Sequence, residues 1–283
     1  DTARVLLIQG QGQEALAIQE ELKALAQGDG LALELMPVVQ AADITPGVKV
    51  VVTEVHVEGF AELAARYPSV QFVDFSLDSQ PVPNLTILGS ANLAVQQAFL
   101  AGYMAAISTS EYRVGMLAME GESGKLEQEG FTNGVHYLCG ICNSKYPPYV
   151  AYPEIVEVTP GGDFQAAAGE LKKKSVKTVY VPPGLASPAS YEAMSRAGLQ
   201  LIGPAKLPNA TTNTWLASVG SDLPATLKTA WPEILSGQAG RGYPVRLKVL
   251  DVNEQLLTAG KLRLVQQVMD DIQSGMIKVE TPQ

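Results

Sequence analysis

Cysteine, histidine and aromatic residues are scarce in this sequence, and it contains no long apolar run. Of the 283 residues, two are cysteine, two are histidine and 6% are aromatic. Two cysteines cannot form a four-cysteine zinc site, and a membrane-spanning helix needs about 18 or more consecutive apolar residues. The sequence therefore predicts neither a metal site nor a transmembrane helix, and it predicts cores built mostly from aliphatic side chains.

Basic residues are also fewer than acidic ones. The chain has 20 basic and 29 acidic residues, which gives a net charge of −9. Nucleic acids and anionic membrane surfaces attract basic proteins, so this balance argues against either as a partner. We interpret the excess of negative charge as a source of solubility, and we expect a monomer.

The two cysteines, Cys139 and Cys142, form a Cys-x-x-Cys motif. In redox enzymes such a motif lies at the N-terminus of a helix, where the helix dipole stabilises a thiolate. Here it follows a predicted helix, Gly124–Leu138, so the dipole opposes the thiolate. This position argues against catalysis and leaves two alternatives open, a structural disulfide or two unreactive thiols.

The segment Leu93–Val135 shows the alternation on which the whole chain is built. Small residues at helical spacing, among them Ala98 and Gly102, predict a helix that lies close on a sheet. A nearly unbroken apolar run, Tyr112–Met119, predicts a strand covered on both faces, and a Gly-rich turn leads into the next helix. Because strands and helices alternate along the chain, the sequence predicts an α/β architecture with doubly wound parallel sheets.

The predicted strands are short and mostly apolar. They are Val5–Gln9, Leu31–Val39, Val48–Val55, Val70–Phe75, Leu85–Leu88, Tyr112–Met119, Ile155–Val158, Thr178–Val181, Leu199–Ile202, Trp215–Val219 and Val245–Val252. The strand Leu85–Leu88 follows a loop that contains two prolines, and we expect it at the edge of a sheet. The last predicted helix is amphipathic and covers Ala259–Ser274.

Seven motifs, spread over most of the chain, follow one another in an order typical of one protein family. They are YPSVQFVDFSLD, AFLAGYMAA, YRVGMLA, EGFTNGV, AGLQLIG, LASVGSD and GKLRLVQQVMDDIQSGMIKV. In this order they resemble the basic membrane protein family of substrate-binding lipoproteins, within the type I periplasmic-binding-protein superfamily. The resemblance implies two doubly wound lobes joined by a three-stranded hinge, and a lipid-anchored protein whose signal peptide is removed.

The resemblance also implies where the lobes divide. Type I binding proteins cross between their lobes three times, which implies hinges near Thr109, Val219 and Arg246. The expected division is residues 1–109 plus about 219–246 in lobe one, 110–218 in lobe two, and 247–283, a strand and a helix, in a lobe that the sequence leaves open.

The turn Gly10–Ala15, GQGQEA, matches the glycine pattern of dinucleotide-binding sites. It lies between a predicted strand and a helix, where glycines let the backbone approach a pyrophosphate. Such a site also requires an acidic residue at the end of the second strand, but this strand ends in Pro37-Val38-Val39-Gln40. We therefore expect no cofactor, and an NAD(P)-dependent oxidoreductase is the weakest of the functional alternatives.

The expected ligand site lies where the strands of both lobes end, because ligands of open α/β sheets bind beyond the carboxyl ends of the strands. Glu54 and Asp74 are the polar side chains expected there. Phe75 and Trp215 are candidates for stacking on a ring, and a place in the core is the alternative for Trp215. The expected ligand-binding residues are Gln9, Gly10, Gln11, Glu54, Asp74, Phe75, Met119, Glu120, Pro183, Gly184, Gly203, Trp215 and Ser221.

The sequence departs from the resembled family at this site. Many members bind purine nucleosides through an Asp- and Asn-rich motif after the first strand, which Gln9–Ala15 lacks. Gly203-Pro204 and Ser221 stand where members carry a ribose-binding Asp and a Lys. Each lost charge-assisted hydrogen bond is worth about 1.5–3 kcal/mol, so a nucleoside would bind roughly 100-fold more weakly. We therefore expect a neutral or weakly polar ligand.

These features predict an extracytoplasmic solute-binding protein that serves an ABC importer and catalyses no reaction. It would lie in the periplasm or on the outer face of the cell membrane, close its lobes on a small molecule, and present the closed form to the permease. A ligand-sensing module that docks on a membrane receptor is the alternative. No catalytic residue is expected, because Ser221 lacks both the second glycine of a nucleophile elbow and a positioned base.

Overall fold

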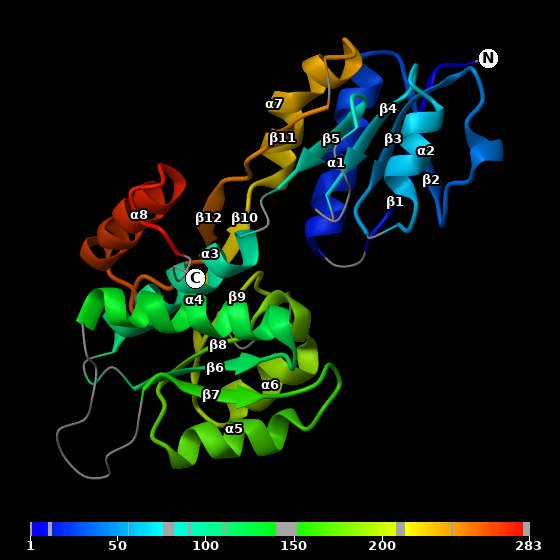
Figure 1. Ribbon diagram of the computed structural model, residues 1–283. Coiled ribbons are helices and arrows are strands. Elements are labelled where there is room, and N and C mark those ends of the chain that lie inside the picture. The colour runs from blue at the N-terminus through cyan, green and yellow to red at the C-terminus, as the bar shows by residue number, and fades with distance from the viewer. Residues whose placement is uncertain are drawn as a thin grey trace. The chain divides into compact units, whose positions relative to one another are not determined.

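The computed structural model describes residues 2–10, 13–55, 57–75, 82–89, 92–109, 111, 113–139, 152–207, 213–238 and 240–279. The chain forms two compact units, each assembled from two separate stretches of sequence (Figure 1). Unit 1 comprises Asp1–Ala91 and Ser221–Arg246, and unit 2 comprises Asn92–Gly220 and Leu247–Gln283. Each is built around its own sheet with parallel strands, which confirms the predicted fold class.

Unit 1 contains a six-stranded sheet in which every neighbouring pair is parallel. The strand order is β11-β5-β4-β3-β1-β2. The bounds are β1 Arg4–Ile8, β2 Ala32–Met36, β3 Val48–Thr53, β4 Gln71–Asp74, β5 Leu85–Leu88 and β11 Gly242–Tyr243. The prediction that Leu85–Leu88 forms an edge strand is wrong, because the two-residue strand β11 pairs with it and takes the edge.

The helices of unit 1 are α1 Gln13–Gly28, α2 Phe60–Arg66 and α7 Leu223–Leu235, with a 3₁₀ turn η1 at Ala41–Asp43. Helix α7 belongs to the second stretch of sequence and packs on α1, where Trp231 Nε1 donates a hydrogen bond of 2.8 Å to Asp29 Oδ2. On α2, Phe60 packs edge-to-face on Phe72 of β4, with their ring centroids 5.4 Å apart. Residues 221–246 are therefore part of the structure of unit 1.

Unit 2 contains a second six-stranded sheet with the order β12-β10-β9-β8-β6-β7. The bounds are β6 Val114–Ala118, β7 Glu154–Glu157, β8 Thr178–Tyr180, β9 Gln200–Gly203, β10 Trp215–Ser221 and β12 Leu247–Leu250. The pairs from β7 across to β10 are parallel. Met116 and Leu117 belong to different core clusters, as expected for a sheet that is buried on both faces.

Helices cover both faces of this second sheet. The bounds are α3 Leu93–Ser108, α4 Glu122–Cys139, α5 Phe164–Lys173, α6 Pro188–Arg196 and α8 Ala259–Gln273, with a 3₁₀ turn η2 at Pro183–Leu185. One core cluster joins α3, α4 and α8 to the sheet, and another joins α5 and α6 to it. Among the described residues, no helix combines the length and the apolar character that crossing a membrane requires.

Helices α3 and α4 touch backbone to backbone. A Cβ added at Gly102 of α3 would lie 2.1 Å from the carbonyl oxygen of Phe131. One added at Gly134 of α4 would lie 1.9 Å from the carbonyl oxygen of Phe99. The small residues of α3 were expected to bring this helix close to a sheet. Helix α3 does pack on the unit 2 sheet, and the structure shows in addition that Gly102 brings it close to another helix.

The division into units differs from the expected one at its first boundary. The chain passes from unit 1 to unit 2 between Ala91 and Asn92, not near Thr109, because α3 is buried in the core of unit 2. The other two passages lie at Gly220/Ser221 and Arg246/Leu247, and residues 247–283 fall in unit 2.

Candidate ligand-binding edges of the two sheets

The structure gathers five of the expected ligand-binding residues at one edge of the unit 1 sheet. Ile8, Thr53 and Asp74 are aligned across β1, β3 and β4, so these parallel strands end side by side. The residues that end or follow these strands are Gln9, Gly10, Glu54, Asp74 and Phe75. We call this group the unit 1 edge. Gln11 lies outside the described residues.

Hydrogen bonds fix several members of the unit 1 edge. The backbone N–H of Gly10 donates to Glu54 Oε2 at 2.6 Å, and Gln9 Nε2 donates to Gln19 Oε1 of α1, also at 2.6 Å. A Cβ added at Gly10 would lie 3.3 Å from Glu54 Cβ, so glycine gives the carboxylate room to approach the backbone. The glycine that resembles a dinucleotide motif is therefore explained by a contact within unit 1.

Asp74 and Phe75 differ in accessibility. Asp74 is only 1% exposed, whereas Phe75 is half-buried and its backbone N–H donates to Thr53 O at 3.0 Å. Burying a carboxylate costs free energy unless the carboxylate is hydrogen-bonded. Asp74 is buried in this way at the end of its strand. At the surface of this edge, the Phe75 ring is thus easier to reach than the Asp74 carboxylate.

The corresponding edge of the unit 2 sheet is less polar. Met119 and Glu120 follow β6, and Pro183 and Gly184 follow β8; we call these four residues the unit 2 edge. A Cβ added at Gly184 would lie 2.4 Å from Met119 Sδ, so the thioether lies directly against η2. Met119 is half-buried, and the other three residues are exposed. This edge therefore offers a polarisable apolar side chain beside exposed backbone.

Trp215 and Gly203 are buried in the core of unit 2. Trp215 begins β10, is 1% exposed, and packs edge-to-face on Tyr191 of α6 with a centroid distance of 5.0 Å. Gly203 is buried, and an added Cβ would lie 2.6 Å from Tyr191 Oη and 2.9 Å from Trp215 Cη2. The structure thus favours the core alternative for Trp215 and corrects the expectation that its ring stacks on a ligand.

The remaining predicted residues are placed as follows. Ser221 ends β10, is 3% exposed, and is the first residue of the second stretch of unit 1. Cys139 ends α4, but its side chain and all of Cys142 lie outside the described residues, so the disulfide remains a prediction. The described part of the chain holds no group of three or more His, Cys, Asp or Glu residues that could bind a metal ion.

One buried carboxyl was missed by sequence reasoning. Glu127 of α4 is 5% exposed, and burial raises its pKa from 4.5 to about 6. It lies four residues before Phe131, which stacks on Tyr180 of β8 with a centroid distance of 5.9 Å. The spacing of i to i+4 places Glu127 and Phe131 on one face of the helix, and this was the available signal.

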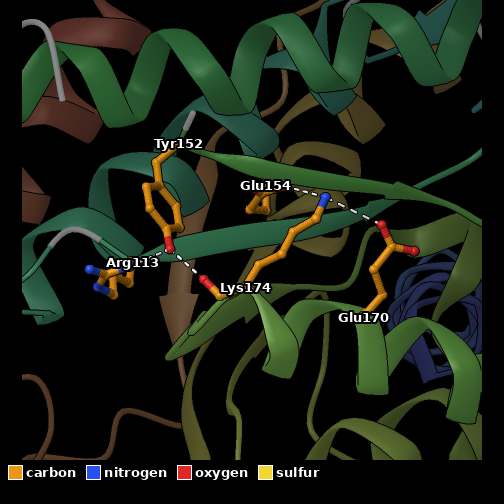
Figure 2. Close-up of polar contacts among 5 residues, drawn as sticks. All are labelled: Arg113, Tyr152, Glu154, Glu170 and Lys174. Carbon is orange, nitrogen blue, oxygen red and sulfur yellow. Dashed lines mark hydrogen bonds and ion pairs between the residues drawn. The ribbon is translucent and has the colours of Figure 1, made fainter. Parts of the chain in front are cut away.

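The opposite end of the unit 2 sheet carries a network of polar residues (Figure 2). Arg113 Nη1 donates to Tyr152 Oη at 2.6 Å, and Tyr152 Oη donates to the carbonyl oxygen of Lys174. Lys174 Nζ lies 2.7 Å from Glu154 Oε2 and 3.3 Å from Glu170 Oε1. The hydrogen bond that Arg113 donates to Tyr152 raises the pKa of Arg113, and the one that Lys174 donates to Glu154 raises the pKa of Lys174. Because all five residues have partners within the network, we interpret it as structural.

Comparisons with solved structures identify the fold. A solute-binding protein of an ABC transporter system from Aeropyrum pernix K1 has a TM-score of 0.71 and 16% identity, over 99% of this chain and 93% of its own. A transcriptional activator of the comK gene from Bacillus halodurans has a TM-score of 0.70 and 20% identity, over 99% and 100%. GanP, a glucose-galactose binding protein from Geobacillus stearothermophilus, has a TM-score of 0.61 and 16% identity, over 88% and 97%.

No protein-family model and no curated protein matches the chain. At the identities found, the likeness to solved structures concerns the fold. Binding proteins and regulators of transcription are both among these structures. The chain therefore has the type I periplasmic-binding-protein fold that its motifs implied.

Proposed function

We propose that this protein is an extracytoplasmic solute-binding protein that takes up a small molecule between its two units and delivers it to an ABC importer. The observation that carries this proposal is the chain path. Two parallel-sheet units are joined by three passages of the chain, at residues 91/92, 220/221 and 246/247. Such joints allow hinge closure, in which a ligand shifts the population from an open to a closed form.

The two edges support a neutral ligand that is rich in hydrogen-bond donors. Glu54 and Asp74 at the unit 1 edge bring negative charge, which disfavours an anion and favours hydroxyl groups. Met119 at the unit 2 edge and the half-buried ring of Phe75 suit an apolar face. A monosaccharide has both properties, and GanP is named for glucose and galactose. Gly203-Pro204 and Ser221 lack the charged groups expected of a nucleoside site.

The importer role also implies a membrane partner and a location in the cell. We propose that a membrane permease recognises the closed form, and that the protein is a monomeric lipoprotein of the basic membrane protein family. It would be anchored at the outer face of the membrane or free in the periplasm. The solute-binding protein of Aeropyrum pernix, which matches over nearly the full length of both chains, supports the transport role.

Native mass spectrometry and calorimetry test the proposal. Mass spectra of the purified protein should show a co-purifying small molecule, and titration with glucose, galactose and ribose should give tighter binding than titration with adenosine or inosine. X-ray scattering should show a smaller radius of gyration when the ligand is bound. A radius that no tested solute changes, together with the absence of any bound small molecule, would contradict the proposal. So would catalytic turnover of a substrate.

Sensing is the second candidate function, in which the closed form docks on a membrane receptor. The XylFII-LytSN complex favours it, because a chain of that complex matches this fold with a TM-score of 0.53 and 13% identity, over 88% of the present chain and 97% of its own. Pull-down with the protein in the presence and absence of its ligand distinguishes the two functions. A permease in the captured complex supports transport, and a receptor kinase supports sensing.

A further inference from the structure

Glu127 is the buried acidic residue that the proposed site does not use. It lies in the second turn of α4 and is 5% exposed. Its Oε2 atom is buried and has no hydrogen-bond partner among the described residues. Buried carboxylates are normally paired or hydrogen-bonded, because an unpaired ion loses its hydration without compensation. Burial therefore favours the neutral form of this carboxyl more strongly in the folded than in the unfolded chain.

No described basic residue lies on α3, β6, β7 or β8. Helix α3 has no acidic or basic residue; its one titratable group, Tyr103, contacts Tyr137 near the far end of α4. Strand β6 has no titratable residue, and β8 contributes Tyr180. The acidic Glu157 of β7 accepts a hydrogen bond from Gln128 at 3.4 Å. These neighbours are neutral or negative, so none of them stabilises an ionised Glu127.

The first turns of α4 are joined tightly to the unit 2 edge. A Cβ added at Gly124 would lie 1.8 Å from the carbonyl oxygen of Met119, so the first turn of α4 rests directly on the end of β6. The side chain of Met119 in turn lies against Gly184 of η2. A shift of the first turns of α4 therefore moves Met119 and alters its contact with η2. Glu127 lies only one helical turn beyond Gly124.

We propose that Glu127 is a proton-binding residue that controls the unit 2 edge. With Glu127 neutral, the first two turns of α4 stay packed and Met119 stays against η2. When Glu127 releases its proton to solvent, the carboxylate moves toward water, and the first turns of α4 and the unit 2 edge loosen with it. The edge is thus more ordered in mildly acidic than in neutral solution. That this order controls ligand uptake rests on the function proposed above.

The direction of the pH effect follows from proton linkage. A carboxyl whose pKa is raised on folding, as for Glu127, holds its proton more tightly in the folded than in the unfolded chain. The packed state therefore loses stability as the pH rises from 4.5, the ordinary value, to about 6, and it does not regain this stability at higher pH.

Hydrogen exchange of the ligand-free protein tests the proposal directly. Amides of residues 115–131 and 183–186 are compared at pH 5 and pH 7.5, after correction for the intrinsic exchange rates. We expect up to about eightfold less protection at the higher pH, the change that a pKa of about 6 in the packed state and 4.5 in the loosened state gives between these two values of pH. In Glu127→Gln, which cannot ionise, protection should be equal at the two values of pH.

The control is Glu122→Gln, which removes an exposed acid from the first turn of the same helix and should leave the pH dependence intact. Equal protection of the wild-type edge at both values of pH, or a pH dependence that persists in Glu127→Gln, overturns the proposal. If Glu127→Gln does not fold, carbon-13 titration of the wild-type Glu127 carboxyl decides, and a midpoint at or below 4.5 overturns it. Because no ligand is added, a failure of the proposed function does not affect the outcome.

Discussion

Units 1 and 2 arrange their strands in the same way, but they differ in the residues that follow those strands. In each sheet, the first strand of the unit lies second from one end, the second strand lies outside it, and later strands lie on its other side. Two carboxylates, Glu54 and Asp74, lie at the unit 1 edge, whereas the unit 2 edge has one, Glu120, beside a thioether and a 3₁₀ turn. The comparison shows that strand order sets where a ligand can bind, and that the residues after each strand set the chemistry.

The units also differ in how their helices pack. Gly102 and Gly134 let α3 and α4 of unit 2 touch through their backbones. In unit 1, α1 and α7 meet through side chains, among them the hydrogen bond from Trp231 to Asp29. A backbone contact cannot be relieved by a change of rotamer. We therefore expect unit 2 to tolerate added volume less well than unit 1.

Gly134→Ala should have the largest effect on stability. The new methyl group would meet the carbonyl oxygen of Phe99, and such overpacking should lower the free energy of unfolding by about 3 kcal/mol. The control, Gly169→Ala in α5, has no atom within 4 Å of the added Cβ and should raise stability by up to about 1 kcal/mol. Urea unfolding measures both changes. Equal stability of the two variants would contradict the backbone contact between α3 and α4.

In unit 1, Asn84→Ala should lower the free energy of unfolding. Asn84 Nδ2 lies within hydrogen-bond distance of the carbonyl oxygens of Ala64, Tyr67 and Val70, at 2.9, 3.1 and 2.7 Å. Their loss should cost about 2 kcal/mol, because buried carbonyls are left without a donor. Hydrogen exchange should show the loss in unit 1 and not in unit 2. Gln27→Ala, at an exposed position of α1, is the control and should change stability by less than about 0.5 kcal/mol.

Ligand affinity should depend more on the unit 1 edge than on the unit 2 edge. Once a ligand is identified, Glu54→Gln should weaken its binding by about 10- to 100-fold, because a charged acceptor becomes a neutral one. Met119→Ala should weaken it by less than about tenfold, since it removes only apolar contact. Calorimetric titration measures both. A larger effect of Met119→Ala would reverse the assignment of polar recognition to unit 1.

Lys174→Met, at the opposite end of the unit 2 sheet, should have the smallest effect. Lys174 is 38% exposed, so its ion pairs should contribute no more than about 1 kcal/mol. Glu154 raises the pKa of Lys174 above 10.5, so this contribution is complete below pH 10.5 and is lost as the pH rises through the raised value. Urea unfolding of the wild type and of Lys174→Met at pH 8 and pH 11 should show a smaller difference in the free energy of unfolding at pH 11. Weaker ligand binding by Lys174→Met would contradict its structural role.

Much of the fold followed from periodicity. The apolar runs and their alternation with helical segments predicted the parallel sheets, and the positions after the strands predicted which residues gather at the unit 1 edge. Strand β11 could not be predicted in this way, because Gly242 and Tyr243 are too few to show a period. The small residues of α3 indicated close packing. They did not show that α3 packs on α4, or that it belongs to unit 2.

The site was harder to predict because exposure depends on tertiary packing. Trp215 is the first residue of β10 and pairs with Leu201 of β9, so it lies at the amino end of its strand. Its ring packs on Tyr191 of α6, a contact that the sequence does not show. Glu127 carries a charged side chain, which normally indicates a solvated position. Its spacing of i to i+4 with Phe131 was the one signal of burial, and the α4 sequence does not show that Tyr180 of β8 stacks on Phe131.

The interleaved chain path has a consequence for biosynthesis. Unit 1 requires α7 and β11, which leave the ribosome only after nearly all of residues 92–220 have been made. Unit 2 in turn requires α8, which follows every segment of unit 1 along the chain. Neither unit can be completed when its first stretch has been made, so the nascent polypeptide exposes apolar strands while the other stretches are synthesised. Such exposed strands favour aggregation, which chaperones prevent.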